Sequence, residues 1–102
     1  MSKDHLKYYA VTTQMDIYPE KLDEFLSYLT ELADYTREAA GCLVHDIYMD
    51  AEEKGRLMMF SVWESIEQYR DFIDWEEKIG MAEKVAQFLT NPPIIRNYNR
   101  ID

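Results

Sequence analysis

The stretch Leu57-Met58-Met59-Phe60-Ser61-Val62-Trp63 is apolar on both of its alternating faces. Successive residues of a strand point to opposite faces of a sheet, so a sheet with one wet face gives an alternation of apolar and polar residues. Here one face of the strand would leave Met58, Phe60 and Val62 uncovered, and an exposed apolar patch of this kind marks an interface. We therefore expect a homodimer that packs sheet against sheet, with neighbours of the patch at Ala10, Val44 and Tyr48.

The sequence on either side of this strand alternates between strand and helix patterns. Residues 8–18 are rich in β-branched and aromatic types, and apolar residues at helical spacing follow Pro19 up to Gly41. Residues 42–50 and 56–63 are joined by a short polar turn, which predicts a hairpin. Ser65 to Gln68 fits a capping box opening a second helix, Gly80 is expected to interrupt it, and a helical face continues to Leu89. A last short strand is expected at residues 94–100, after Pro92 and Pro93.

This order predicts an α+β domain of the ferredoxin-like, split βαβ type. The four-stranded sheet would be antiparallel, with the helices on one face. At 102 residues the chain is expected to form a single domain, residues 1–102, and residues 1–7 are expected to form a flexible tail.

Composition excludes several classes of function. The chain has 20 acidic residues against 11 basic ones, and its net charge of -9 disfavours nucleic acid and anionic membranes as partners. Three scattered glycines cannot form a phosphate-binding loop. The N-terminus has no secretion signal, no segment has the length of a membrane span, and Cys42 is the only cysteine. We therefore expect a cytoplasmic protein.

Four short motifs resemble the antibiotic biosynthesis monooxygenase (ABM) domain family. They are Tyr18-Pro19-Glu20-Lys21, Glu38-Ala39-Ala40-Gly41-Cys42-Leu43, Val62-Trp63-Glu64-Ser65 and Asn91-Pro92-Pro93-Ile94-Ile95. Their order and spacing cover nearly the whole chain. The resemblance implies a dimeric α+β barrel. It also implies one of several chemistries, which include oxidation of quinols or anthrones without a cofactor, haem degradation and processing of a phosphorylated sugar.

Side-chain alternation gives candidate site residues between helices and sheet. On the second strand we expect Leu43, His45 and Ile47 to face the helices, with Cys42 on the other face. The ordinary pKa of histidine lies near neutrality, so His45 could take a proton from a phenol; the alternative is a histidine satisfied in the core.

The remaining candidates are substrate-binding residues. Trp63 matches the tryptophan of the family motif, which implies a pocket wall for a flat ring. Thr13 stands where haem-degrading members carry an asparagine. Phe72 stands where many members carry a histidine. The resemblance therefore implies no haem site. Tyr69 could point a hydroxyl into the pocket and Met59 could shape it, although both residue types more often serve packing.

No metal or cofactor site is predicted. Cys42 and His45 are expected on opposite faces of their strand, and the acidic run at residues 74–77 is interpreted as a solvated helix face.

The leading hypothesis is a cofactor-independent monooxygenase, or related proton-transfer enzyme, acting on a small hydrophobic quinol-like or phenolic compound. The alternative is a non-catalytic dimer that binds a small ligand or regulates a partner. Isomerisation of a phosphorylated sugar is a third hypothesis, and it would require a cationic pocket built from Arg56, Arg70 or Arg96.

Overall fold

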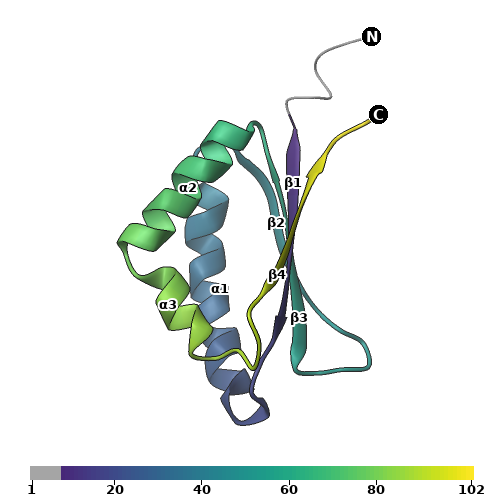
Figure 1. Cartoon of the computed structure of the whole chain (residues 1–102), viewed down its shortest axis with the longest axis vertical. Coiled ribbons are helices and arrows are strands. Elements are labelled where there is room, and N and C mark those ends of the chain that lie inside the picture. The colour runs from purple at the N-terminus through teal and green to yellow at the C-terminus, as the bar shows by residue number, and fades with distance from the viewer. Residues whose placement is uncertain (1–7) are drawn as a thin grey trace.

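The computed structural model describes residues 8–102, and in them all helices lie on one face of an antiparallel sheet (Figure 1). The strands are β1 (Tyr9–Asp16), β2 (Cys42–Met49), β3 (Arg56–Trp63) and β4 (Ile94–Asn99). Their order across the sheet is β2-β3-β1-β4, and every neighbouring pair is antiparallel. The predicted ferredoxin-like α+β fold is confirmed. The tail expected at residues 1–7 lies outside the described residues.

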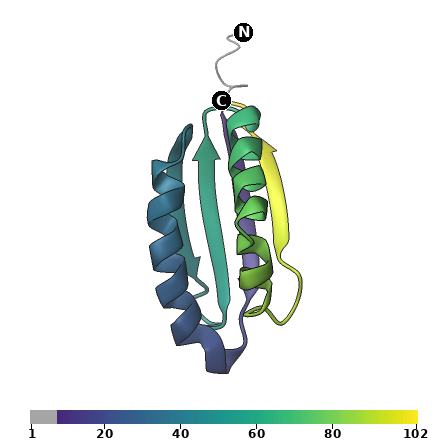
Figure 2. The same ribbon diagram turned by 90° about the vertical axis from the view of Figure 1, so that its left-hand side faces the viewer.

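The helices begin and end at the signals in the sequence. A short 3-10 turn, η2 (Pro19–Lys21), leads into α1 (Leu22–Glu38). Ser65 caps α2 (Ile66–Lys78), because its hydroxyl accepts a hydrogen bond from the Gln68 amide at 3.2 Å. Gly80, at φ +74°, separates α2 from α3 (Met81–Ala86), since a left-handed residue cannot continue the helix. Figure 2 shows α1 beside the pair α2 and α3, all running along the sheet.

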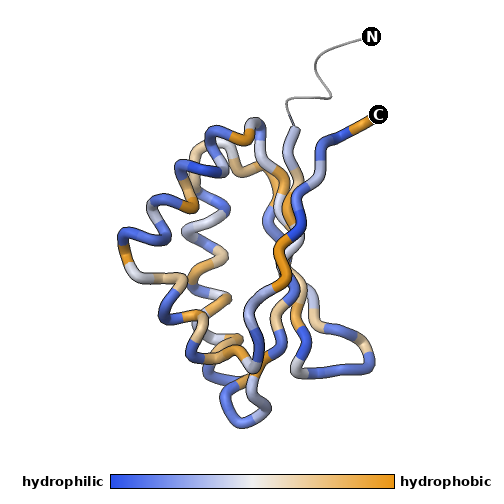
Figure 3. Tube along the Cα trace, viewed as in Figure 1, coloured by the Kyte–Doolittle hydropathy of each residue, from blue (hydrophilic) through white to orange (hydrophobic). Residues whose placement is uncertain are grey.

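The core lies between helices and sheet. Phe25 and Leu29 from α1 pack against Met15 of β1 and Leu57 of β3, and Phe88 closes the cluster after α3. Phe25 and Phe88 meet with their ring centroids 4.9 Å apart. In the hydropathy view, hydrophobic stretches gather in the strands and hydrophilic residues recur along α2 (Figure 3). The amphipathic pattern thus directs one face of each helix to the sheet.

A β-bulge changes the expected facing of residues on β2. The register pairs Cys42 with Trp63 and Val44 with Val62, so Leu43 is an extra residue. Leu43 is 47% exposed, and its expected place facing the helices is wrong. Cys42 and His45 lie opposite Trp63 and Ser61, so both fall on the helix-facing side of the sheet. The expectation that these two residues point to opposite faces is therefore also wrong.

The other face of the sheet carries an apolar strip on β3, and none of the described helices lies over it. Val62 lies between Ala10 of β1 and Val44 of β2, and Met58 lies opposite Tyr48. These are the neighbours expected for the apolar patch. Met58 and Tyr48 are 40% and 52% exposed.

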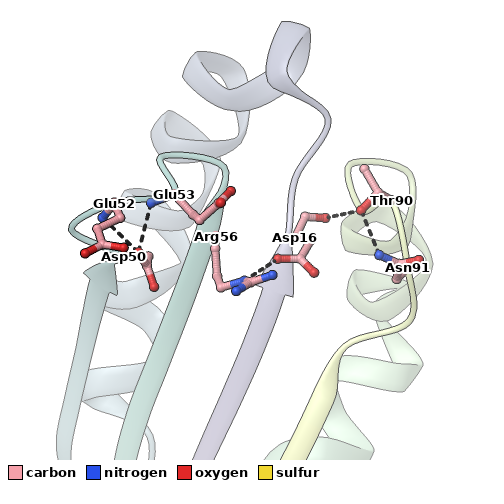
Figure 4. Close-up of polar contacts among 7 residues, drawn as sticks. All are labelled: Asp16, Asp50, Glu52, Glu53, Arg56, Thr90 and Asn91. Atoms are coloured by element: carbon pink, nitrogen blue, oxygen red, sulfur yellow. Dashed lines mark hydrogen bonds and ion pairs between the residues drawn. The ribbon is translucent and has the colours of Figure 1, made fainter.

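Polar contacts fix the chain at one end of the sheet (Figure 4). Arg56 donates from Nε to the Asp16 carboxylate at 2.9 Å, which joins the starting end of β3 to the last residue of β1. The Asp50 carboxylate accepts hydrogen bonds from the amides of Glu52 and Glu53 and so shapes the hairpin turn. The Thr90 hydroxyl donates to the Asp16 carbonyl, which holds the segment before β4 against β1.

Within residues 8–102, no helix is long and apolar enough to cross a membrane.

Candidate functional site

A cavity of about 90 Å³ lies between the helices and the sheet. Its walls come from β1, β2 and β3 below and from α1, α2 and α3 above. Five of the six residues predicted for the site line it: Thr13, His45, Met59, Trp63 and Phe72. Aliphatic side chains complete the walls, among them Leu29, Leu32, Ala33, Met81 and Val85.

His45 is buried at 8% exposure on the cavity side of β2. Its Nδ1 atom has no hydrogen-bond partner among the described residues. Burial lowers the pKa of His45 below 6.5, and the nearby Arg37 cation lowers it further, against a smaller opposing effect of Asp46. The imidazole is therefore neutral at pH 7 and can accept a proton or a hydrogen bond.

An aromatic wall forms one side of the cavity. Trp63 is 1% exposed, and its ring lies 5.2 Å from that of Phe72 between centroids. The Trp63 indole N–H donates to the Ser61 hydroxyl at 3.0 Å, which fixes the plane of the indole. A flat, rigid apolar surface of this kind suits a flat ring.

Tyr69 is the one predicted site residue that does not line the cavity. Its ring packs against the rings of Trp63 and Tyr9, each 5.6 Å away between centroids. Burial, with smaller contributions from Glu76 and Tyr9, raises the pKa of Tyr69 to about 12. Its place is behind the aromatic wall, where it supports Trp63.

Glu76 lines the cavity, although the acidic run at residues 74–77 was expected to be a solvated helix face. Burial raises the pKa of Glu76 to about 7. The ion pairs between described residues, which join Arg37 to Asp34, Arg56 to Asp16 and Arg100 to Asp102, do not include it. The available signal was its spacing, four residues after Phe72 and seven after Tyr69, which places Glu76 on the apolar face of α2.

Two other polar residues of the cavity are hydrogen-bonded within the protein. The Thr36 hydroxyl donates to the Leu32 carbonyl at 3.0 Å, and the Ser61 hydroxyl accepts from Trp63. Neither Arg56, Arg70 nor Arg96 lines the cavity. The cationic pocket that a phosphorylated sugar would require is therefore not built here.

Within the described part of the chain, no group of three or more His, Cys, Asp or Glu side chains is arranged to hold a metal ion.

Comparison with known proteins agrees with this geometry. The sequence profile described as antibiotic biosynthesis monooxygenase matches residues 8–77. The chain belongs to the antibiotic biosynthesis monooxygenase family. At the level of the family, the function is of the monooxygenase type.

Solved structures share the ABM fold at low sequence identity. A conserved protein from Methanosarcina mazei Go1 is 19% identical with a TM-score of 0.87, covering 96% of this chain and 97% of its own. The Rv0793 protein of Mycobacterium tuberculosis is 21% identical with a TM-score of 0.84, covering 93% and 96%. A structure named antibiotic biosynthesis monooxygenase is 19% identical with a TM-score of 0.84, covering 92% and 99%. A search of curated proteins found no match for this ABM chain.

Proposed function

We propose that this ABM protein is a cofactor-independent monooxygenase that acts on a small hydrophobic quinol-like or phenolic compound. The observation that carries the proposal is the cavity, which the neutral His45 imidazole lines together with the Trp63 and Phe72 rings. The Nδ1 atom of this imidazole has no hydrogen-bond partner among the described residues. The aromatic wall orients a flat ring, and the imidazole takes the proton of its hydroxyl. Thr13 and Met59 complete the binding surface.

Removal of that proton makes the chemistry with oxygen feasible. A phenolate is electron-rich and transfers electrons to O₂ directly. For a one-ring quinol the balance is quinol plus O₂ to hydroxyquinone plus water, so one oxygen atom enters the ring and the other leaves as water. Both electron pairs come from the substrate, and the protein supplies orientation and a proton acceptor.

We also propose that the active form is a homodimer joined through the open face of the sheet. The support is the apolar surface of β3 at Met58, Phe60 and Val62, which none of the described helices covers. A groove of about 660 Å³ continues this surface toward Tyr98 and Ile101. A second copy presents the same apolar strip, so two sheets can cover each other.

Oxygen uptake on a panel of one-ring and two-ring quinols tests the proposed reaction. His45→Ala and Trp63→Phe should each lower kcat/KM, His45→Ala by roughly a hundredfold or more if it removes the general base. Trp75→Phe is the matched control, because Trp75 is 39% exposed and does not line the cavity. Unchanged turnover in both cavity variants would rule out the assignment.

The second candidate is a non-catalytic protein that binds a small ligand in the same cavity. The observation favouring it is the predominance of apolar side chains in the walls. Native mass spectrometry of the purified protein, followed by the oxygen-uptake assay, separates the two candidates. A tightly held aromatic ligand without oxygen consumption on any quinol would favour the binding protein.

A further inference from the structure

The cavity holds a second titratable side chain opposite the sheet. Glu76 reaches it from α2, whereas His45 reaches it from β2. The two groups therefore come from different layers of the fold. A ligand between the layers has one such group toward the helices and another toward the strands.

Glu76 and His45 are the two titratable groups of the cavity. Of its hydroxyl groups, Thr36 and Ser61 are hydrogen-bonded within the protein, and Thr13 belongs to the binding surface. His45 Nδ1 has no hydrogen-bond partner among residues 8–102, and burial raises the pKa of Glu76. Glu76 is half-buried in the cavity wall, and the ion pairs between described residues do not include it. A titratable group in such a place is a candidate for contact with a ligand.

The size of the cavity limits what that ligand can be. At about 90 Å³ it is well below the roughly 300 Å³ at which pockets for drug-sized ligands begin. A single aromatic ring is the class that fits, and a fused polycyclic compound would have to force the helices from the sheet.

We propose that Glu76 is a second proton-accepting residue of the site, and that the ligand is a one-ring diphenol whose two hydroxyls face Glu76 and His45. This rests on the proposed function and deepens it. Oxidation of a quinol to a quinone releases two hydroxyl protons. In this arrangement His45 takes one proton and becomes a cation, the Glu76 carboxylate takes the other and becomes neutral, and the electrons pass to the O₂ of the proposed reaction. The two protons thus leave from opposite ends of the ring.

The charged and titratable surroundings of Glu76 are few. Tyr28 from α1 and Tyr69 from its own helix lie close enough for Glu76 to raise their pKa values. Lys84 of α3 lies over the Tyr28 ring, 4.3 Å from its centroid. The residues that β1, β3 and α3 contribute to the cavity wall do not titrate, and His45 is already neutral above pH 6.5.

Calorimetry with 1,4-hydroquinone under nitrogen tests the proposal without any oxygen chemistry. An ionised carboxylate accepts a stronger hydrogen bond than a neutral acid, so affinity should rise by roughly fivefold as the pH is raised through about 7. Glu76→Gln keeps the shape of the side chain and should remove this rise. Glu77→Gln, at the exposed neighbouring position, should keep it. Circular dichroism of each variant confirms that it is folded.

Three results would overturn the proposal: no binding of hydroquinone to the wild type, the same pH dependence in Glu76→Gln as in the wild type, or its loss in Glu77→Gln. The same proteins in air separate this inference from the proposed function. Glu76-dependent binding without oxygen uptake retains the diphenol site and rejects the monooxygenase. Oxygen uptake, together with a pH dependence of binding that is unchanged in Glu76→Gln, retains the monooxygenase and rejects the diphenol site.

Discussion

The indole N–H of Trp63 donates to the hydroxyl of Ser61, two residues earlier on β3, over 3.0 Å, and both residues are buried. Residues i and i+2 of a strand point to the same face, which is why this hydrogen bond can form within one strand. It orients the ring that Phe72 and Tyr69 then pack against. The cavity wall is thus fixed by a polar contact as well as by packing.

Ser61→Ala should destabilise the protein by about 1–3 kcal/mol, because it leaves a buried indole N–H without an acceptor. Urea unfolding followed by circular dichroism measures the free energy of unfolding. Ser27→Ala, on the exposed face of α1, serves as the control and should change it little. Equal losses in the two variants would show that the Trp63 contact contributes nothing to stability.

The two glycines with positive φ differ in their surroundings and should respond differently to alanine. At Gly41, φ is +87° and an added Cβ would lie 2.8 Å from Cβ of Gln68. At Gly80, φ is +74° and nothing lies within 4 Å. Gly80→Ala should therefore cost about 1 kcal/mol for the left-handed backbone alone, and Gly41→Ala should cost more because α2 must also shift.

Thermal or urea unfolding of both glycine variants checks this order. Gly41→Ala with a free energy of unfolding equal to or above that of Gly80→Ala would contradict it.

The sequence predicted the elements well because each is marked by local chemistry. The stretch at residues 56–63 coincides with β3, and the Ser65 cap and Gly80 mark the boundaries of α2. The faces of the sheet to which Cys42 and Leu43 of β2 point were mispredicted, because strict alternation assumes a strand pairing without a bulge. The bulge at Leu43 depends on how β2 pairs with β3, and the sequence of β2 alone does not encode it.

Glu76 was missed for a different reason. An acidic residue next to other acidic residues, here Asp74 and Glu77, is ordinarily solvated. The acidic run was therefore given more weight than the helical spacing, which places Glu76 one turn after Phe72. Only the packing of α2 over the sheet makes that position part of the cavity. Conversely, Tyr69 has the spacing of the apolar face of α2, but it lies beside the first residue of β1. There the Tyr9 and Trp63 rings pack against its ring.

Met58→Asp should convert the proposed dimer to a monomer, because it places a charge in the middle of the apolar face of β3. Met58 is 40% exposed in the single chain, so the fold should tolerate the change. Size-exclusion chromatography with light scattering at micromolar concentration measures the mass. Ser27→Asp adds the same charge on the exposed face of α1 and should leave the mass unchanged. A wild-type monomer, or a Met58→Asp dimer, would contradict the sheet-to-sheet interface.

Stability should fall as the pH rises from about 4.5 to about 7, to the extent that Glu76 controls it. Its pKa is raised from 4.5 to about 7 in the folded chain, so in this window the folded state holds a proton that the unfolded state has lost. The unfolded state binds fewer protons, and the free energy of unfolding therefore decreases with pH, by at most about 3 kcal/mol. Above about pH 7 the dependence due to this group ends.

Glu76→Gln isolates that contribution, because a neutral amide has no proton to lose. The difference in unfolding free energy between wild type and Glu76→Gln should fall between pH 4.5 and 7 and then level off. His45 and Asp50, whose pKa values are lowered in the fold, are present in both proteins, so their effects cancel in the difference. The corresponding difference for Glu77→Gln should be flat. A flat difference for Glu76→Gln as well would mean that the carboxyl group reaches water in the folded protein and is not confined to the cavity.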